Sequence, residues 1–174
     1  MDGPYIIDDI DGERFQLNRS VLVEPEVLKI EHQRVFARSW IYVGHESEIS
    51  FPGDFKTRTV AGRPVIFARD GSGQVRTFLN TCRHRVAMLC REREGNQNSF
   101  TCMYHGWTYD IDGACLETPG EPANSQLKNS VFQGAYPVRD YHGLLFAYMG
   151  PPDELPDFPL YDTLVYPEDD EVLP

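Results

Sequence analysis

The spacing of hydrophobic positions separates a helical segment near the N-terminus from a longer β-rich segment. An apolar stripe at helical spacing contains Leu28, His32, Val35, Phe36 and Trp40. Pro25 suits the first turn of a helix, because it lacks the N–H that this turn leaves unsatisfied. The pattern predicts an amphipathic helix over residues 25–41, with His32 a packed or interfacial side chain and not a ligand. Residues 1–19 mix acidic and scattered apolar side chains, which indicates a poorly ordered lead-in.

From Pro52 onward the period changes to short runs rich in Val, Ile, Phe and Thr, which are typical of β-strands. Turn-forming pairs, Ala61-Gly62 and Asp112-Gly113 among them, separate several of these runs. We expect strands over residues 54–60, 64–69, 75–80, 107–111, 137–140 and 144–149. The fold predicted is a mostly β, antiparallel domain with a leading N-terminal α-helix and two loops at one end.

Beyond Gly150 the composition shifts to prolines and acidic residues, including the run Glu168-Asp169-Asp170-Glu171. Such a composition favours an extended linker over a packed element. We therefore expect three parts. These are a lead-in and helix at 1–45, a β domain at 46–150, and an acidic proline-rich linker at 151–174 toward a domain absent from this chain.

Composition and charge narrow the class of protein. With 174 residues, of which 41% are hydrophobic and 25% charged, the chain is long enough for one globular domain with its own core. Its formal net charge of −11 argues against nucleic acids and anionic membranes as partners. No apolar run reaches the length of a membrane span and the acidic N-terminus does not resemble a signal peptide, so we expect a cytoplasmic location.

The candidate chemistry lies in two short loops with the sequences Cys-Arg-His and Cys-Met-Tyr-His, whose possible ligands are Cys82, His84, Cys102 and His105. Each loop offers one thiolate and one imidazole, so each can reach both irons of a [2Fe–2S] cluster in which two histidines replace two cysteines on one iron. Cys82 and Cys102 then hold the iron that stays ferric, and the histidines hold the iron that accepts the electron. A Cys₂His₂ zinc site needs the same ligands, but it usually takes a cysteine pair from one loop and a histidine pair from another. The alternation favours the cluster. Small buried side chains are expected for the remaining cysteines, Cys90 and Cys115.

The surrounding residues resemble the Rieske signature of the α (large) subunits of aromatic-ring-hydroxylating oxygenases. The similar stretches are Asn80-Thr81-Cys82-Arg83-His84-Arg85, Cys102-Met103-Tyr104-His105-Gly106-Trp107-Thr108-Tyr109-Asp110, Ala87-Met88-Leu89-Cys90, Asp112-Gly113, Phe36, Trp40, Gly44-His45 and Pro52-Gly53-Asp54-Phe55. The resemblance covers most of residues 20–150, and within the family it is nearest to enzymes acting on aromatic acids. It implies a Rieske-type [2Fe–2S] β-sandwich in which the four candidate ligands bind the cluster.

Four residues are expected to surround the cluster, namely Tyr104, Gly106, Trp107 and Tyr109. We expect Trp107 to pack beside His105 and to shield the cluster, and Gly106 to let the backbone turn close to the metal. The Tyr109 hydroxyl either reaches a cluster sulfur or belongs to an ordinary strand aromatic.

The resemblance also bears on the redox potential. High-potential Rieske proteins carry two further cysteines that form a disulfide, and Ala87 and Tyr104 stand at those positions here. Trp107 replaces a serine that donates to a bridging sulfide in those proteins. Fewer hydrogen bonds to sulfur disfavour the reduced state, so we expect a potential near the low end of the roughly −150 to +300 mV Rieske range.

Two features of the first loop stand out. The family usually has glycine where this chain has Val86, and a valine is strained there if the position takes a positive φ. Positive charge also gathers around this loop, at Arg83, Arg85, Arg91 and Arg93. We interpret it as a docking rim for an acidic ferredoxin or an oxygenase subunit; solvated surface arginines are the alternative, favoured for Arg91 and Arg93.

The resemblance implies that oxygen activation belongs to a C-terminal domain with a mononuclear Fe(II) held by two histidines and a carboxylate. Only one histidine, His142, follows His105, so we expect this chain to relay electrons and not to hydroxylate a ring by itself. Expected partners are a ferredoxin or reductase as donor, the oxygenase catalytic domain and a small β subunit, in a trimer-based oligomer. A stand-alone Rieske-type ferredoxin and a structural zinc-binding module are the alternatives.

Overall fold

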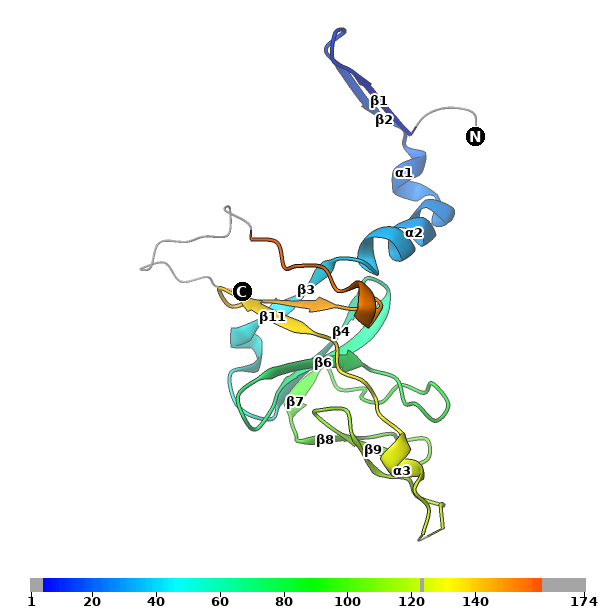
Figure 1. Cartoon of the computed structure of the whole chain (residues 1–174), viewed down its shortest axis with the longest axis vertical. Helices are drawn as coiled ribbons and strands as arrows, with labels where there is room; N and C mark the ends of the chain where they lie inside the picture. Colours follow the sequence, from blue (N-terminus) through cyan, green and yellow to red (C-terminus); the bar gives the residue numbers. More distant parts are fainter. Residues whose placement is uncertain (1–4, 123, 161–174) are drawn as a thin grey trace.

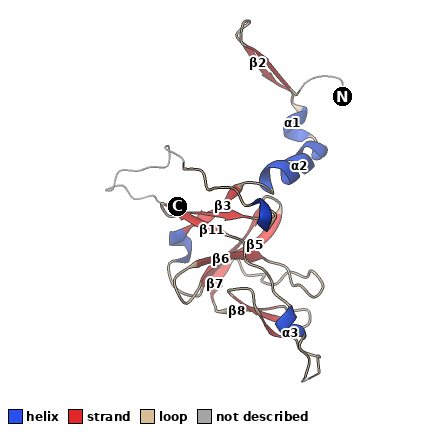
Figure 2. Cartoon of the chain, in the orientation of Figure 1, coloured by secondary structure: helices blue, strands red, loops and turns tan. Residues whose placement is uncertain are grey.

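The computed structural model describes residues 5–122 and 124–160. Antiparallel strands form most of its regular structure, and its helices are short (Figures 1 and 2). Grouped by sheet, the strands are β1 (Ile6–Asp9) and β2 (Arg14–Leu17); β6 (Val75–Leu79), β5 (Arg63–Arg69), β4 (Asp54–Val60) and β7 (Glu94–Asn96); β11 (Val138–Tyr141), β12 (Leu144–Tyr148) and β3 (Trp40–His45); β10 (Cys115–Glu117), β9 (Thr108–Asp110) and β8 (Ser99–Thr101). The helices are α1 (Ser20–Val23), α2 (Pro25–Glu31), the π-helix η1 (His32–Phe36), the 3₁₀-helix η2 (Glu46–Ile49), α3 (Leu127–Ser130) and the 3₁₀-helix η3 (Pro152–Glu154). The predicted mostly β, antiparallel architecture with a leading helix is confirmed.

The N-terminal arm, residues 5–36, extends away from the body of the molecule (Figure 1). Its first part was expected to be poorly ordered, but β1 and β2 pair there as an antiparallel hairpin. The Asp9 carboxylate accepts a hydrogen bond from the Gly12 N–H at 3.0 Å and so stabilises the turn between them. The prediction of a poorly ordered lead-in was therefore wrong for the residues of this hairpin. Its two strands have four residues each, which is too few for a clear alternation of apolar and polar positions.

The predicted helix over residues 25–41 is correct at its start and wrong at its end. Pro25 occupies the first turn of α2, and the helix then widens into η1, where the Ala37 N–H bonds to the His32 carbonyl oxygen at 3.0 Å. The chain leaves the helix after Phe36, and Trp40 opens β3, where it pairs with Tyr148 of β12. Trp40 continued the apolar stripe only by spacing, because it is a half-buried strand residue that packs against Tyr148 and does not lie on a helix face.

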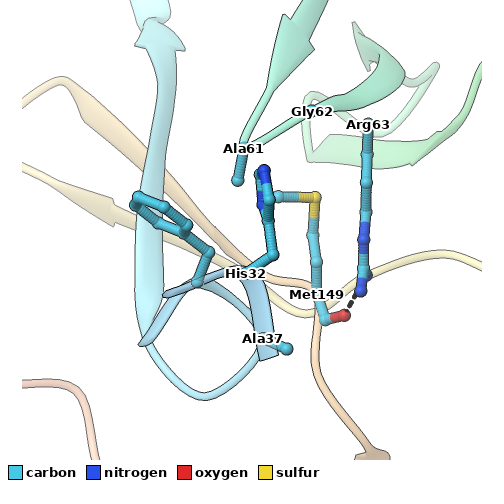
Figure 3. A pocket seen from close by; sticks show the side chains of 7 residues that line it. His32, Ala37, Ala61, Gly62, Arg63 and Met149 are labelled. Carbon is cyan, nitrogen blue, oxygen red and sulfur yellow. Dashed lines mark hydrogen bonds between the residues drawn. The ribbon is translucent and has the colours of Figure 1, made fainter. Parts of the chain in front are cut away.

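A small hollow lies at the junction of the arm and the body (Figure 3). It has a volume of about 220 Å³ and is lined by His32, Phe36, Ala37, Ala61, Gly62, Arg63 and Met149. His32 packs so closely on Gly62 that a Cβ added to this glycine would lie 3.0 Å from its Cε1 atom. The expectation that His32 is a packed side chain is therefore confirmed.

Strand β5 lies at the centre of the body and separates two hydrophobic clusters. Successive side chains of a strand point to opposite faces, and here both faces are buried. Ile66 and Ala68 join the cluster that also contains Cys82 and Cys102, whereas Val65 and Phe67 join the cluster beneath the β11–β12–β3 sheet. The four-stranded sheet thus lies between the β8–β9–β10 sheet and the β11–β12–β3 sheet (Figure 1).

The turn after β5 is organised by the buried carboxylate of Asp70. Its oxygens accept hydrogen bonds from the Ser72 N–H (2.8 Å), the Ser72 hydroxyl (2.6 Å), the Gln74 N–H (2.9 Å) and the Arg76 Nε (2.9 Å). Burial alone raises the pKa of Asp70, but these donors outweigh it and lower the pKa below its ordinary value.

The segment after Gly150 follows the β11–β12–β3 sheet as far as residue 160. The Trp40 Nε1 donates to the Pro156 carbonyl oxygen at 3.1 Å, and the Phe158 ring lies 5.5 Å from the Trp40 ring and 5.3 Å from the Phe146 ring. The rest of the predicted linker lies outside the described residues, so the division into three parts stays a prediction. Among the helices within residues 5–122 and 124–160, none is long and apolar enough to span a membrane.

Candidate metal centre

The first candidate ligand loop follows β6 and contains Cys82 and His84. Two backbone hydrogen bonds close it: the Cys82 N–H donates to the Ala87 carbonyl oxygen at 2.7 Å, and the Val86 N–H donates to the Cys82 carbonyl oxygen at 2.9 Å. Closing the loop in this way puts Val86 at φ +59°, a conformation that a β-branched residue rarely adopts. The expected strain at Val86 is confirmed.

The second loop follows β8 and repeats this backbone pattern. The Cys102 N–H donates to the Trp107 carbonyl oxygen, and the Gly106 N–H donates to the Cys102 carbonyl oxygen, both at 2.8 Å. Gly106 has φ +73° and meets the geometric requirement without strain. The histidine is the fourth residue of this loop and the third of the first loop, so two similar backbones offer their imidazoles from different positions.

The four predicted ligands lie in one region. Cys82 and Cys102 are each 2% exposed, belong to the same hydrophobic cluster and form no disulfide. The rings of His84 and His105 are 4.5 Å apart, centroid to centroid, at an interplanar angle of 64°. The Nδ1 atom of His84 is buried and has no hydrogen-bond partner. A buried ring nitrogen without a partner beside unpaired thiols is a donor set that suits a soft metal centre.

Aromatic rings cover both histidines. Trp107, which is 8% exposed, stacks on His84 with the ring centroids 4.8 Å apart and an interplanar angle of 8°. The His105 ring lies against Tyr104, with the ring centroids 3.9 Å apart. The expected packing of Trp107 beside His105 stays a prediction. Burial, then the neighbouring His84 and Arg85, lower the pKa of His105.

The Tyr109 hydroxyl reaches the first loop. Its oxygen lies 3.4 Å from the Cys82 Sγ and accepts a hydrogen bond from the Arg83 N–H at 3.2 Å. Since its oxygen already accepts from Arg83, its proton is available to the sulfur. Burial and the neighbouring Cys82 raise the pKa of Tyr109, so the hydroxyl keeps this proton at neutral pH. The sequence left two roles for Tyr109, an ordinary strand aromatic or a hydroxyl that reaches a sulfur of the site. Its contact with the sulfur of Cys82, a predicted ligand, favours the second role.

Two residues that hold the first loop had no role in the sequence interpretation. The side-chain amide of Asn80 donates to the Cys90 carbonyl oxygen and accepts from the Cys90 N–H, each at 2.7 Å, which closes the base of the loop. Gln133, at 2% exposure, donates to the carbonyl oxygens of Leu79 and Thr81. Asn80 belongs to the motif around Cys82, so the sequence could have indicated its role. Gln133 is about fifty residues away in sequence, and no motif around it indicates that it contacts this loop.

The basic residues of the first loop are exposed, and one of them has a defined partner. Arg83, Arg85, Arg91 and Arg93 all lie at the surface. The Arg83 side chain donates to the carbonyl oxygens of Phe132 at 3.3 Å and of Gln133 at 3.2 Å, so this arginine is partly structural. A docking role for the group stays a prediction.

Known proteins resemble this chain in both sequence and structure. Residues 39–142 match the Rieske [2Fe-2S] domain. The chain is 39% identical to the chlorobenzene dioxygenase subunit alpha of Cupriavidus sp. over 131 residues, which are 73% of this chain and 29% of that protein. It is 36% identical to the anthranilate 1,2-dioxygenase large subunit of Acinetobacter baylyi over 156 residues, 87% of this chain and 33% of that protein.

Solved structures give the same result. Naphthalene 1,2-dioxygenase with indole bound in its active site superposes with a TM-score of 0.72 at 31% identity, covering 78% of this chain and 32% of that one. The quaternary ammonium Rieske monooxygenase CntA superposes with a TM-score of 0.67 at 30% identity, covering 75% of this chain and 37% of that one. The chain thus spans about a third of the length of the relatives that it matches.

Proposed function

This chain belongs to the Rieske [2Fe-2S] domain family, and on that premise we propose that Cys82, His84, Cys102 and His105 hold its cluster and that the domain relays electrons within an aromatic-ring-hydroxylating oxygenase. The observation that carries the ligand assignment is the buried Nδ1 atom of His84, which lacks a hydrogen-bond partner in a region that also holds two buried, unpaired thiols. Metal coordination gives such a nitrogen the partner that burial otherwise denies it.

The cluster supplies a centre that takes up and gives up one electron. The chain's own residues prepare its surroundings. Cys82 and Cys102 bind iron as thiolates, and Trp107 covers the face of His84 and keeps water from it. The Tyr109 hydroxyl donates toward the Cys82 sulfur and stabilises negative charge there. His105 is half-buried, so its outer ring nitrogen can hold or release a proton near the surface.

A structural zinc site is less well supported by the order of the ligands along the chain. Each loop offers one cysteine and one histidine, whereas a zinc site usually draws a cysteine pair from one loop and a histidine pair from another. Each iron of a [2Fe–2S] cluster takes two ligands from the protein, so two loops that each carry both types suit the cluster.

We propose the following partners: a ferredoxin or reductase as electron donor, an oxygenase catalytic domain with mononuclear iron, and a small β subunit in a trimer-based oligomer. The relatives named as alpha or large subunits of dioxygenases support this assignment over a stand-alone Rieske-type ferredoxin. Unpaired thiols support the proposed cytoplasmic location, where cysteines stay reduced. The net charge of −11 supports the absence of nucleic-acid and anionic-membrane partners.

The names of the relatives bear on the substrate of such an oxygenase. The nearest resemblance was expected among enzymes acting on aromatic acids, and the large subunit of an anthranilate dioxygenase is indeed a relative. Dioxygenases named for benzene, chlorobenzene and biphenyl match to a similar extent. We therefore propose an aromatic compound and assign no class within it.

Replacing single ligands tests the assignment. Cys82→Ser and His105→Ala should yield protein without a full complement of iron and acid-labile sulfide, because each removes a bond to iron. Cys90→Ser is the matched control, since Cys90 is also buried but its thiol donates to the Glu92 carbonyl oxygen. A red-brown His105→Ala protein with two irons per chain would refute the ligand set, and cluster loss in Cys90→Ser would show that the wrong cysteine was chosen.

A further inference from the structure

The two ligand loops share a backbone pattern but differ in how they are stabilised. The second loop is closed by neighbouring residues of its own hairpin: the Thr101 and Thr108 hydroxyls lie 3.0 Å apart, and the Thr108 hydroxyl donates to the Gly106 carbonyl oxygen at 3.2 Å. The first loop is closed at its base by Asn80 and Cys90, but it is also held by a segment about fifty residues further along the chain, Phe132 and Gln133. The first loop thus depends on a distant part of the structure.

The first loop also contains the strained position. Val86 takes φ +59°, whereas the equivalent residue of the second loop is Gly106 at φ +73°. The Val86 side chain is 76% exposed, so its own packing does not offset the strain. A residue in a sparsely populated conformation persists only where the surrounding structure over-determines it.

Gln133 supplies such a constraint. Its Nε2 atom donates to the carbonyl oxygens of Leu79 at 2.7 Å and of Thr81 at 2.5 Å, at the end of β6 where the loop begins. Its own N–H donates to the Gly113 carbonyl oxygen at 2.6 Å, which fixes Gln133 to the turn between β9 and β10. The end of β6 is therefore tied to the β8–β9–β10 sheet, which carries the second loop between β8 and β9.

The Arg83 side chain provides the second connection, through its hydrogen bonds to the carbonyl oxygens of Phe132 and Gln133. Thr81 and Arg83 are the two neighbours of Cys82 in the chain. The Gln133 side chain bonds to the Thr81 carbonyl oxygen, and the Gln133 carbonyl oxygen accepts from the Arg83 side chain. Gln133 therefore restrains Cys82 from both sides.

We propose that Gln133 is the positioning residue of the first ligand loop, and that its amide keeps Cys82 and His84 in place against the strain at Val86. The inference rests on the proposed function insofar as the two residues are cluster ligands. It goes beyond that function because it makes the retention of the cluster depend on a residue that lies outside both ligand loops.

The test is a double-mutant cycle. Gln133→Met keeps the length and burial of the side chain and removes both donated hydrogen bonds. We expect iron release to a chelator to become at least roughly tenfold faster, because iron leaves from the opened loop and the loss of two hydrogen bonds shifts the equilibrium between the closed and opened loop by about that factor or more. Val86→Gly in the same chain should return the rate close to that of the original protein, because the strain is gone. Glu13→Gly relieves a positive φ in the distant hairpin and should rescue nothing.

Hydrogen exchange of the Cys82 and Val86 amides in metal-free protein gives a second readout that does not require a cluster. Gln133→Met should accelerate both, and Gln74→Met, an exposed control in the turn between β5 and β6, should accelerate neither. If Gln133→Met alone does not fold, the proposal predicts that the double variant with Val86→Gly does.

The outcomes separate this inference from the function on which it rests. Unchanged iron release and unchanged amide exchange in Gln133→Met overturn it, as do purely additive effects of Gln133→Met and Val86→Gly, which indicate ordinary packing. A protein that binds no cluster at all overturns the proposed function, while the amide exchange still decides whether Gln133 restrains the loop.

Discussion

Removing the Tyr109 hydroxyl should lower the reduction potential of the cluster. Tyr109→Phe deletes the group that lies 3.4 Å from the Cys82 Sγ and accepts from the Arg83 N–H. The ring is fully buried, and phenylalanine fills the same space, so the fold should persist. Because burial and Cys82 raise the pKa of Tyr109, the hydroxyl is a proton donor at neutral pH. A donor to sulfur stabilises the more negative, reduced state more than the oxidised state.

The magnitude follows from the strength of one such bond. A hydrogen bond to a charged group contributes about 1.5–3 kcal/mol, and only the part that differs between oxidation states affects the potential. If that part is about 1 kcal/mol, the potential of a one-electron centre falls by roughly 40 mV. Protein-film voltammetry or a dye-mediated titration followed by circular dichroism measures this shift. Tyr42→Phe, in β3, is the control and should leave the potential unchanged. If the reduction potential of the Tyr109→Phe protein equals or exceeds that of the original protein, the Tyr109 hydroxyl does not stabilise the reduced cluster.

Three further predictions concern stability and the loops. Trp107→Ala removes a buried core side chain whose ring stacks on His84. The free energy of unfolding measured in urea should fall by about 3–5 kcal/mol, and iron should be released faster. An unchanged unfolding midpoint would contradict this. Asn80→Ala leaves the Cys90 N–H and carbonyl oxygen without their partners and should cost about 1–3 kcal/mol, whereas a neutral effect would show that water replaces the amide. Because the pKa of Asp70 is lowered, its ionised form stabilises the fold above the ordinary aspartate pKa of about 4, and this stabilisation is lost as the pH falls through the lowered pKa. Asp70→Asn should therefore flatten this part of a plot of the urea unfolding midpoint against pH. A plot parallel to that of the original protein would exclude Asp70 as a contributor.

The sequence indicated the β domain well where strands are long and bounded by turn residues. The strand predicted at 54–60 matches β4, and those at 64–69 and 75–80 differ from β5 and β6 by one residue each. Three-residue strands such as β7 and β8 carry too few positions for a period to emerge, and β3 was hidden because Trp40 continued the helical spacing. The π-helix that ends the helical segment depends on a backbone bond that spacing does not encode.

The candidate site was visible for a different reason, namely that each loop carries its ligands within four consecutive residues. The chemistry of Cys82 and His84 can therefore be interpreted without knowing the fold. The residues that hold the loop cannot be identified in this way, because Gln133 follows β8, β9 and β10 in the sequence and reaches the first loop only in the folded chain. The stacking of Trp107 on His84 likewise depends on how one loop faces the other.

We propose that two cysteines and two histidines of this chain hold one [2Fe–2S] cluster. The most direct test is an electron paramagnetic resonance spectrum of the dithionite-reduced protein, recorded with and without ¹⁵N-labelled histidine, with iron and acid-labile sulfide assayed on the same sample. We expect a rhombic signal with a low average g value, two irons per chain, and hyperfine coupling to histidine nitrogen that changes with the label. A colourless, silent sample that contains one zinc per chain would contradict it and indicate a structural metal site.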